Sequence, residues 1–476
     1  MVRHTRSARR PALGAPGGAG GVPVAGRAPS HHCVPVTTNV DAPPVSRLRQ
    51  GITGRLLFLF ILGDVLGAGI YALVGELAAE SGGALWAPLL VALAMAMLTA
   101  ASYAELVTKY PRAGGAAIFA QRAFHRPAIS FLVGFSMLSA GVVSAAGLAI
   151  AFSGDYLATF AAVPPALAAP VFLALLALLN ARGIRESVRS NVVMTVVEVA
   201  GLVLVIVAVA VAFAAGRGDA GRILEVPDGV GPGAAVLGGA LLAFYSFVGF
   251  ETSANVAEEV RDVSRVYPRA LFGSLAVAGL VYVLIGLASA VIMEPADLAG
   301  SSSPLLDVVE AAGVGVPGWA FSAIALIAVA NGALLTMIMA SRLAYGMADA
   351  GLLPPVLTRV LPGRRTPWVA IAVTTAVAMA LTLIGDLAVL AETVVLLLLF
   401  VFLSTNAAVL VLRKDRVDHE HFRTPVVLPV LALVSCVVLL TQQSLQVWAY
   451  GTGLLAVGVL VHLLTRRSTR PAVTGR

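Results

Sequence analysis

The sequence has few charged residues and almost no cysteine. Only 12% of its 476 residues are charged and 59% are hydrophobic, whereas a soluble domain carries about 25% charged residues. The two cysteines, Cys33 and Cys436, are too few for a disulfide framework. A chain with this much apolar surface cannot stay disordered either. These shortages exclude an ordinary soluble protein, and they leave a chain whose apolar surface faces lipid.

Long apolar runs recur along the chain at the length of membrane-spanning helices, which need about 20 apolar residues each. We predict twelve spans, at residues 56–78, 86–106, 129–152, 166–181, 192–214, 234–256, 270–293, 319–345, 368–385, 390–412, 425–442 and 447–464. The predicted fold class is therefore an all-α integral membrane protein.

The positions of the basic residues orient these spans. If the N-terminus is cytoplasmic, then of the 32 Lys and Arg residues only Arg217 and Arg222 fall on the outer side. Cytoplasmic loops are enriched in Lys and Arg, so we expect a multi-pass protein of the cell membrane with both termini in the cytoplasm. Topology thus accounts for the formal charge of +7, and nucleic-acid binding is not predicted.

Two of the predicted spans contain residues that interrupt a helix. The first has Gly63, Gly67 and Gly69 around the acidic Asp64, and the sixth carries aromatic residues, glycine and an acid at 244–251. Glycine in a helix interior costs roughly 1 kcal/mol relative to alanine. Backbone groups freed at membrane depth are tolerated where they line a cavity. The interruptions therefore predict a binding element, and close packing against a neighbouring helix is the alternative.

The two interrupted spans are five apart, so they cross the bilayer in opposite directions. Paired interruptions in oppositely oriented halves are typical of inverted-repeat transporters, whose substrate site lies near the middle of the membrane. This arrangement favours a transporter over the other classes of membrane protein.

Four stretches resemble motifs of the amino acid-polyamine-organocation permeases, which share a five-plus-five inverted-repeat fold with the bacterial leucine transporter. They are residues 63–71, 103–115, 244–269 and 341–354. The resemblance implies transport by alternating access. The expected parts are a disordered basic tail at 1–48, repeats at 49–215 and 234–413, two further helices at 424–465 and a cytoplasmic tail at 466–476.

The same resemblance implies where the substrate carboxylate binds. In that family the backbone amides of the broken first helix hold it, and the matching positions are Gly67, Ala68, Gly69 and Ile70. Unpaired amides at the N-terminus of a half-helix favour an anion for the same physical reason.

The substrate ammonium group would lie on freed carbonyl groups at positions that match Val65, Tyr245 and Val248, with Ser246 in the same stretch. An aromatic residue at the Tyr245 position resembles the ring that closes over the substrate from outside in the family. Ordinary packing is the alternative role for this ring.

Acidic residues at membrane depth are costly and are therefore functional candidates. Asn191, Thr195 and Glu198 follow the spacing of one helix face. In some proton-coupled relatives a lysine matches Glu198. This glutamate could exchange a proton, act as a permanently protonated hydrogen-bond donor, or bind an ion or the substrate.

Two further acids belong to the interrupted spans. Glu251 matches an acid that is linked to proton sensing in some relatives, and it is a second candidate for the titrating group. Asp64 could attract a cationic substrate or hydrogen-bond the broken backbone. Residues 330–333 of the eighth span lack the adjacent hydroxyls that hold sodium in this fold, so H⁺ is favoured over Na⁺ as the coupling ion.

The sequence contains few of the motifs and residue groups that enzymes use for catalysis. It contains no GxxxxGK[ST] phosphate loop, no catalytic triad, and only His419 and His421 as a weak metal pair, so no catalytic residue, cofactor or metal is predicted. We expect a secondary transporter for an amino acid, with a cationic amino acid or a polyamine as further substrate classes. Proton symport is preferred to exchange or uniport. An intramembrane enzyme or a transport-inactive sensor or partner subunit is the alternative from another class.

Overall fold

The computed structural model describes residues 52–67, 69–111, 115–182, 184–362, 364, 366–383 and 385–468. Its regular structure is almost entirely helical, with one isolated β-bridge between Ile52 and Val260. The predicted all-α fold class is therefore confirmed. The predicted tail at 1–48 and Ala68 lie outside the described residues, as do residues 469–476.

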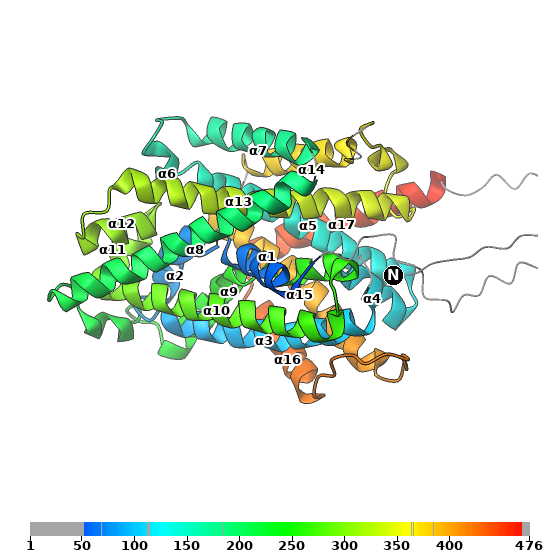
Figure 1. The fold of residues 1–476 in the computed structure, drawn as a ribbon, viewed down its shortest axis with the longest axis horizontal. Helices are drawn as coiled ribbons and strands as arrows, with labels where there is room; N and C mark the ends of the chain where they lie inside the picture. The colour runs from blue at the N-terminus through cyan, green and yellow to red at the C-terminus, as the bar shows by residue number, and fades with distance from the viewer. Residues whose placement is uncertain are drawn as a thin grey trace, which may run out of the picture. The chain divides into compact units, whose positions relative to one another are not determined.

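The helices follow the predicted spans closely and lie side by side, most of them along the horizontal axis of Figure 1. The α-helices are α1 Gly54–Leu66, α2 Gly69–Ser81, α3 Trp86–Lys109, α4 Gly115–Phe124, α5 Pro127–Phe152, α6 Asp155–Ala158, α7 Pro165–Arg182, α8 Ile184–Ala214, α9 Pro232–Ser246, α10 Val263–Ile292, α11 Pro295–Ala299, α12 Pro304–Ala312, α13 Gly318–Asp349, α14 Trp368–Leu381, α15 Leu387–Leu412, α16 Val427–Thr441 and α17 Leu445–Ser468. The 3₁₀ helices are η1 Ala220–Leu224, η2 Phe250–Glu259 and η3 Pro355–Thr358.

Helix length and composition make this a multi-pass membrane protein. Ten helical segments of the described residues are long and apolar enough to cross a bilayer, and the shorter apolar helices α14 and α16 lie at the ninth and eleventh predicted spans. Two of the ten segments are composite: α1 with α2 forms one, and α9 with η2 forms the other. Large apolar side chains on the outer helices, such as Leu178 and Val193, are exposed, as expected where a helix contacts lipid.

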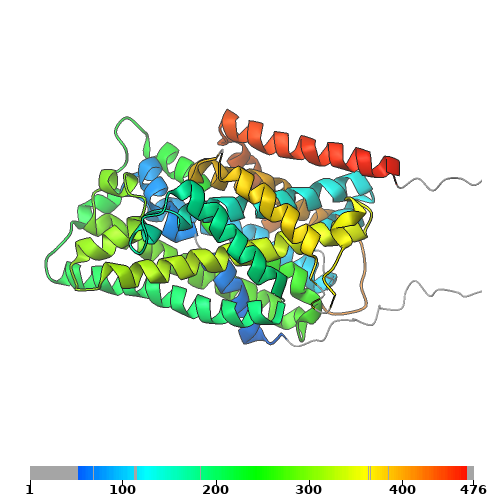
Figure 2. The same cartoon turned by 90° about the horizontal axis from the view of Figure 1, so that it is seen from above.

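Helices pack most closely where their side chains are smallest. On α3, Ala92, Ala96, Ala100 and Ala104 are completely buried, and this helix contacts α9 and α10. Small residues at four-residue spacing allow such approach in lipid. Helix α17 lies at the edge, shown in red in Figure 2, and contacts α5 and α15. The two interrupted segments lie in the interior, and they position the candidate site.

Candidate functional site

The first interruption separates α1 from α2. Helix α1 ends at Leu66 and α2 begins at Gly69, while the amide of Gly67 still reaches the Gly63 carbonyl at 3.4 Å. A Cβ atom on Gly63 would lie 1.9 Å from Thr195 Oγ1 of α8. Gly63 therefore permits close packing of α1 against α8, whereas the helix is interrupted after Leu66, next to Gly67 and Gly69.

The second interruption separates α9 from η2. Helix α9 ends at Ser246, and Gly249 has a φ of +126°, a conformation that favours glycine. A Cβ atom on Gly249 would lie 2.7 Å from the Asp64 carbonyl oxygen, and one on Gly69 would lie 2.8 Å from Ser246 Cα. The two interruptions are thus in direct contact, and glycine is what allows their backbones to approach.

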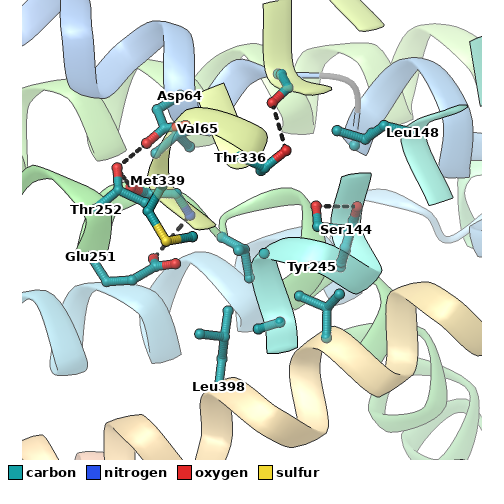
Figure 3. Close-up of a pocket in the computed structure, with 18 of the residues that line it drawn as sticks. Asp64, Val65, Ser144, Leu148, Tyr245, Glu251, Thr252, Thr336, Met339 and Leu398 are labelled. Atoms are coloured by element: carbon teal, nitrogen blue, oxygen red, sulfur yellow. Dashed lines mark hydrogen bonds between the residues drawn. The ribbon is translucent and has the colours of Figure 1, made fainter. Parts of the chain in front are cut away.

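A cavity of about 40 Å³ lies where the two interruptions meet (Figure 3). The predicted residues that line it are Asp64, Val65, Gly67, Gly69, Tyr245, Ser246, Val248 and Glu251. Helices α5, α13 and α15 complete the lining with Ser144, Thr336 and Leu398 among others. This volume has room for the centres of a few water molecules.

The ring of Tyr245 is held at the cavity by α5. Its hydroxyl lies 3.1 Å from Ser144 Oγ, and Figure 3 shows both side chains at the same wall. Ser144 lies among the small residues of α5, such as Ala140 and Gly141, a composition that by itself indicates helix packing. Its hydroxyl is a site feature that spacing alone could not reveal.

The two acids of the cavity are both hydrogen-bonded. Thr252 of η2 donates to the Asp64 carboxylate and lies 2.8 Å from the Gly249 carbonyl, as the dashed lines in Figure 3 indicate. Glu251 Oε2 accepts from the Gly249 amide at 2.9 Å. Asp64 therefore joins α1 to η2 through a side chain rather than through the broken backbone. The role of Thr252 could not be predicted from the sequence, because its partner Asp64 is distant along the chain.

The third predicted acid lies behind the first interruption, away from the cavity lining. Asn191, Thr195 and Glu198 are all completely or almost completely buried on one face of α8, and Asn191 Nδ2 donates to Asn331 Oδ1 of α13 at 3.2 Å. Within the described residues, neither carboxylate oxygen of Glu198 accepts a hydrogen bond of standard geometry, and nor does Thr195 Oγ1. The side chain of Asn331 nevertheless lies close enough to interact with the Glu198 carboxyl group. Ile70 is also buried outside the lining.

A family model described as amino acid permease matches residues 54–455 of the chain. The chain belongs to the amino acid permease family. The match begins at the first residue of α1 and ends within α17, so it contains both interruptions and every helix that lines the cavity.

Individual permeases and transporters resemble the chain over most of its length. It is 31% identical to an uncharacterized transporter of Mycobacterium tuberculosis, with 91% of this chain and 94% of the relative covered. The branched-chain amino acid permease BcaP of Bacillus subtilis is 26% identical, with 86% and 92% covered. The chloroplastic cationic amino acid transporter 9 of Arabidopsis thaliana is 29% identical, with 64% and 56% covered. The family and these relatives indicate a transporter rather than an enzyme.

Proposed function

We propose that this permease is a secondary transporter that carries an amino acid across the cytoplasmic membrane by alternating access, in symport with protons. One observation carries the proposal: two helices are interrupted, the interruptions contact each other, and they line one cavity. Both termini lie in the cytoplasm in this proposal, in agreement with the placement of the basic residues.

The two interruptions offer groups of opposite polarity to a zwitterion. Helix α2 begins at Gly69, which lines the cavity. The first amides of a helix have no intrahelical carbonyl partner, so they suit a carboxylate. The carbonyl groups that end α1 and α9 suit an ammonium group, because the C-terminal end of a helix carries partial negative charge. Recognition in this proposal uses backbone groups, and the ring of Tyr245 closes over them.

Glu198 carries the proton in this proposal. Burial disfavours a carboxylate relative to a neutral carboxyl group, and Glu198 is completely buried. An aqueous path that opens during transport would reverse that preference and release the proton. Glu251 is the second candidate, although it already accepts a hydrogen bond from Gly249.

Uptake into proteoliposomes tests the proposal. Purified protein is supplied with a panel of labelled amino acids and polyamines, with and without an inward proton gradient. We expect saturable uptake of at least one amino acid, with stimulation by the gradient. Saturable uptake that is unchanged by the proton gradient would reject proton symport but not amino acid transport. The absence of both uptake and label exchange across the whole panel would reject transport itself.

A cationic substrate is a second candidate because both Asp64 and Glu251 line the cavity. The same panel separates the classes, since arginine, lysine or putrescine should then outcompete leucine. In the double variant Asp64→Asn and Glu251→Gln, uptake of a cationic substrate should fall more than uptake of a neutral one. An equal loss of uptake for cationic and neutral substrates would show that Asp64 and Glu251 do not select substrates by charge.

A further inference from the structure

Tyr282 of α10 reaches the ends of both interrupted helices with one hydroxyl group. Its oxygen lies 2.6 Å from the carbonyl oxygen of Val65, 2.9 Å from that of Leu66 and 3.1 Å from that of Ser246. We propose that Tyr282 is a positioning residue that holds the unwound segments of α1 and α9 in the geometry that binds substrate. This inference rests on the proposed function, although Tyr282 itself is outside the cavity lining.

The three carbonyl groups need a donor because of where they lie. Leu66 is the last residue of α1 and Ser246 is the last residue of α9, and the final carbonyls of a helix have no intrahelical donor. Unsatisfied backbone groups are expensive at membrane depth, where water is scarce. The hydroxyl of Tyr282 is a side-chain donor from a third helix at the point where both helices end.

One hydroxyl cannot satisfy three carbonyl groups at the same time. It carries a single hydrogen, so at any moment at least two of the carbonyls of Val65, Leu66 and Ser246 receive none from it. The C-terminal ends of α1 and α9 both bring partial negative charge to this place. The site is therefore left electron-rich, and it favours the positive ammonium group of a substrate in the adjoining cavity.

The ring of Tyr282 is held independently of its hydroxyl. It is completely buried and packs edge to face against Phe247, with ring centroids 5.2 Å apart. Because α1 and α9 share the same hydroxyl, a movement of either segment away from the other must break one set of these contacts. The hydroxyl thus sets the separation of the two segments, while the ring fixes where the hydroxyl lies.

The variant Tyr282→Phe removes the hydroxyl and keeps the ring. We expect a rise in the KM for amino acid uptake of about 5- to 10-fold, the effect of one lost hydrogen bond, with a smaller change in maximal rate. The control is Tyr267→Phe on the same helix, where the lost contact is to Ser253 Oγ at 2.7 Å. Its KM should stay within about twofold of the original, since that hydroxyl touches neither helix end.

Hydrogen–deuterium exchange in nanodiscs provides a readout that needs no substrate. In Tyr282→Phe, peptides covering residues 60–71 and 244–248 should exchange faster, whereas they should not in Tyr267→Phe, whose lost contact is to Ser253 of η2. In the original protein, saturating substrate should slow exchange in these two segments. Size-exclusion profiles of both variants verify that they remain folded.

The outcomes distinguish this inference from the proposed function. Unchanged exchange in both segments, or faster exchange with an unchanged KM, would overturn the positioning role. If the original protein transports nothing while Tyr282→Phe still loosens both segments, the proposed function fails and the structural part of the inference stands. If Tyr282→Phe does not fold, the absence of substrate protection in the original protein overturns the inference.

Discussion

The two acids that line the cavity, Asp64 and Glu251, differ in their hydrogen bonding from Glu198, which lies outside the lining. Asp64 accepts from Thr252 and Glu251 accepts from the Gly249 amide, so each is tied to the second interruption. Glu198 is completely buried, and among the described residues its carboxyl group accepts no hydrogen bond of standard geometry, with only the Asn331 side chain close enough to interact with it. A hydrogen-bonded acid stabilises the arrangement that it joins, whereas a buried acid with fewer hydrogen bonds pays more to remain charged. The proposed function assigns substrate binding to the cavity and proton transfer to Glu198, and the following predictions test this division.

The largest effect is expected where the two interruptions touch. In Gly69→Val the new side chain would begin 2.8 Å from Ser246 Cα, and backbone cannot yield as a flexible side chain can. Uptake per inserted protein should fall by about 100-fold or more, since a misplacement of about 1 Å at a site can cost that much. Gly453→Val on α17 is the control, because a Cβ there meets nothing within 4 Å. Normal uptake by Gly69→Val would remove the cavity from substrate handling.

The second prediction separates proton handling from substrate handling. Glu198→Gln has no group to titrate, so uptake should lose its rise at low external pH while saturation by substrate persists. The ratio of uptake at pH 5.5 to that at pH 7.5 is the measurement, and it should approach about one. Glu251→Gln is the comparison variant and should keep the ratio of the original protein. If Glu251→Gln loses the pH response and Glu198→Gln keeps it, then Glu251 rather than Glu198 couples proton movement to transport.

The third prediction concerns the ring that closes the cavity. Tyr245→Ala removes apolar surface that is almost fully buried, and the KM should rise by more than about tenfold, because a buried aromatic ring contributes several kcal/mol. The pH response should be unaffected, since Glu198 is outside the cavity lining. Binding measured by substrate-dependent thermal stabilisation checks the KM. Unaltered affinity would show that the ring only packs.

The smallest effect should come from the hydroxyl of the same ring. Tyr245→Phe and Ser144→Ala each remove the 3.1 Å contact between these side chains, and each should raise the KM by about 2- to 10-fold. Since they break one hydrogen bond, the double variant should be no worse than the worse single variant. Fully additive effects would mean that the two hydroxyls act separately.

The interruptions could be predicted from the sequence because they depend on residues within one short segment. Glycines at 63, 67 and 69, and the stretch at 244–251, weaken a helix wherever it packs. The contacts of Thr252 and Tyr282 could not be predicted in this way. Thr252 meets Asp64 across 188 residues and Tyr282 meets Val65 across 217, and no local pattern distinguishes a buried tyrosine that bonds the backbone from one that only packs.

Local composition was enough to establish the membrane class, the spans and the two helix interruptions, because helix length and glycine content act over neighbouring residues. Packing between distant helices decided the rest. It placed Tyr282 between two helix ends, gave Asp64 and Glu251 their donors, and buried Glu198 on α8 beside Asn331 of α13. The physical reason is that a polar group at membrane depth takes its properties from its partners, and partners are brought together only when the whole chain has folded.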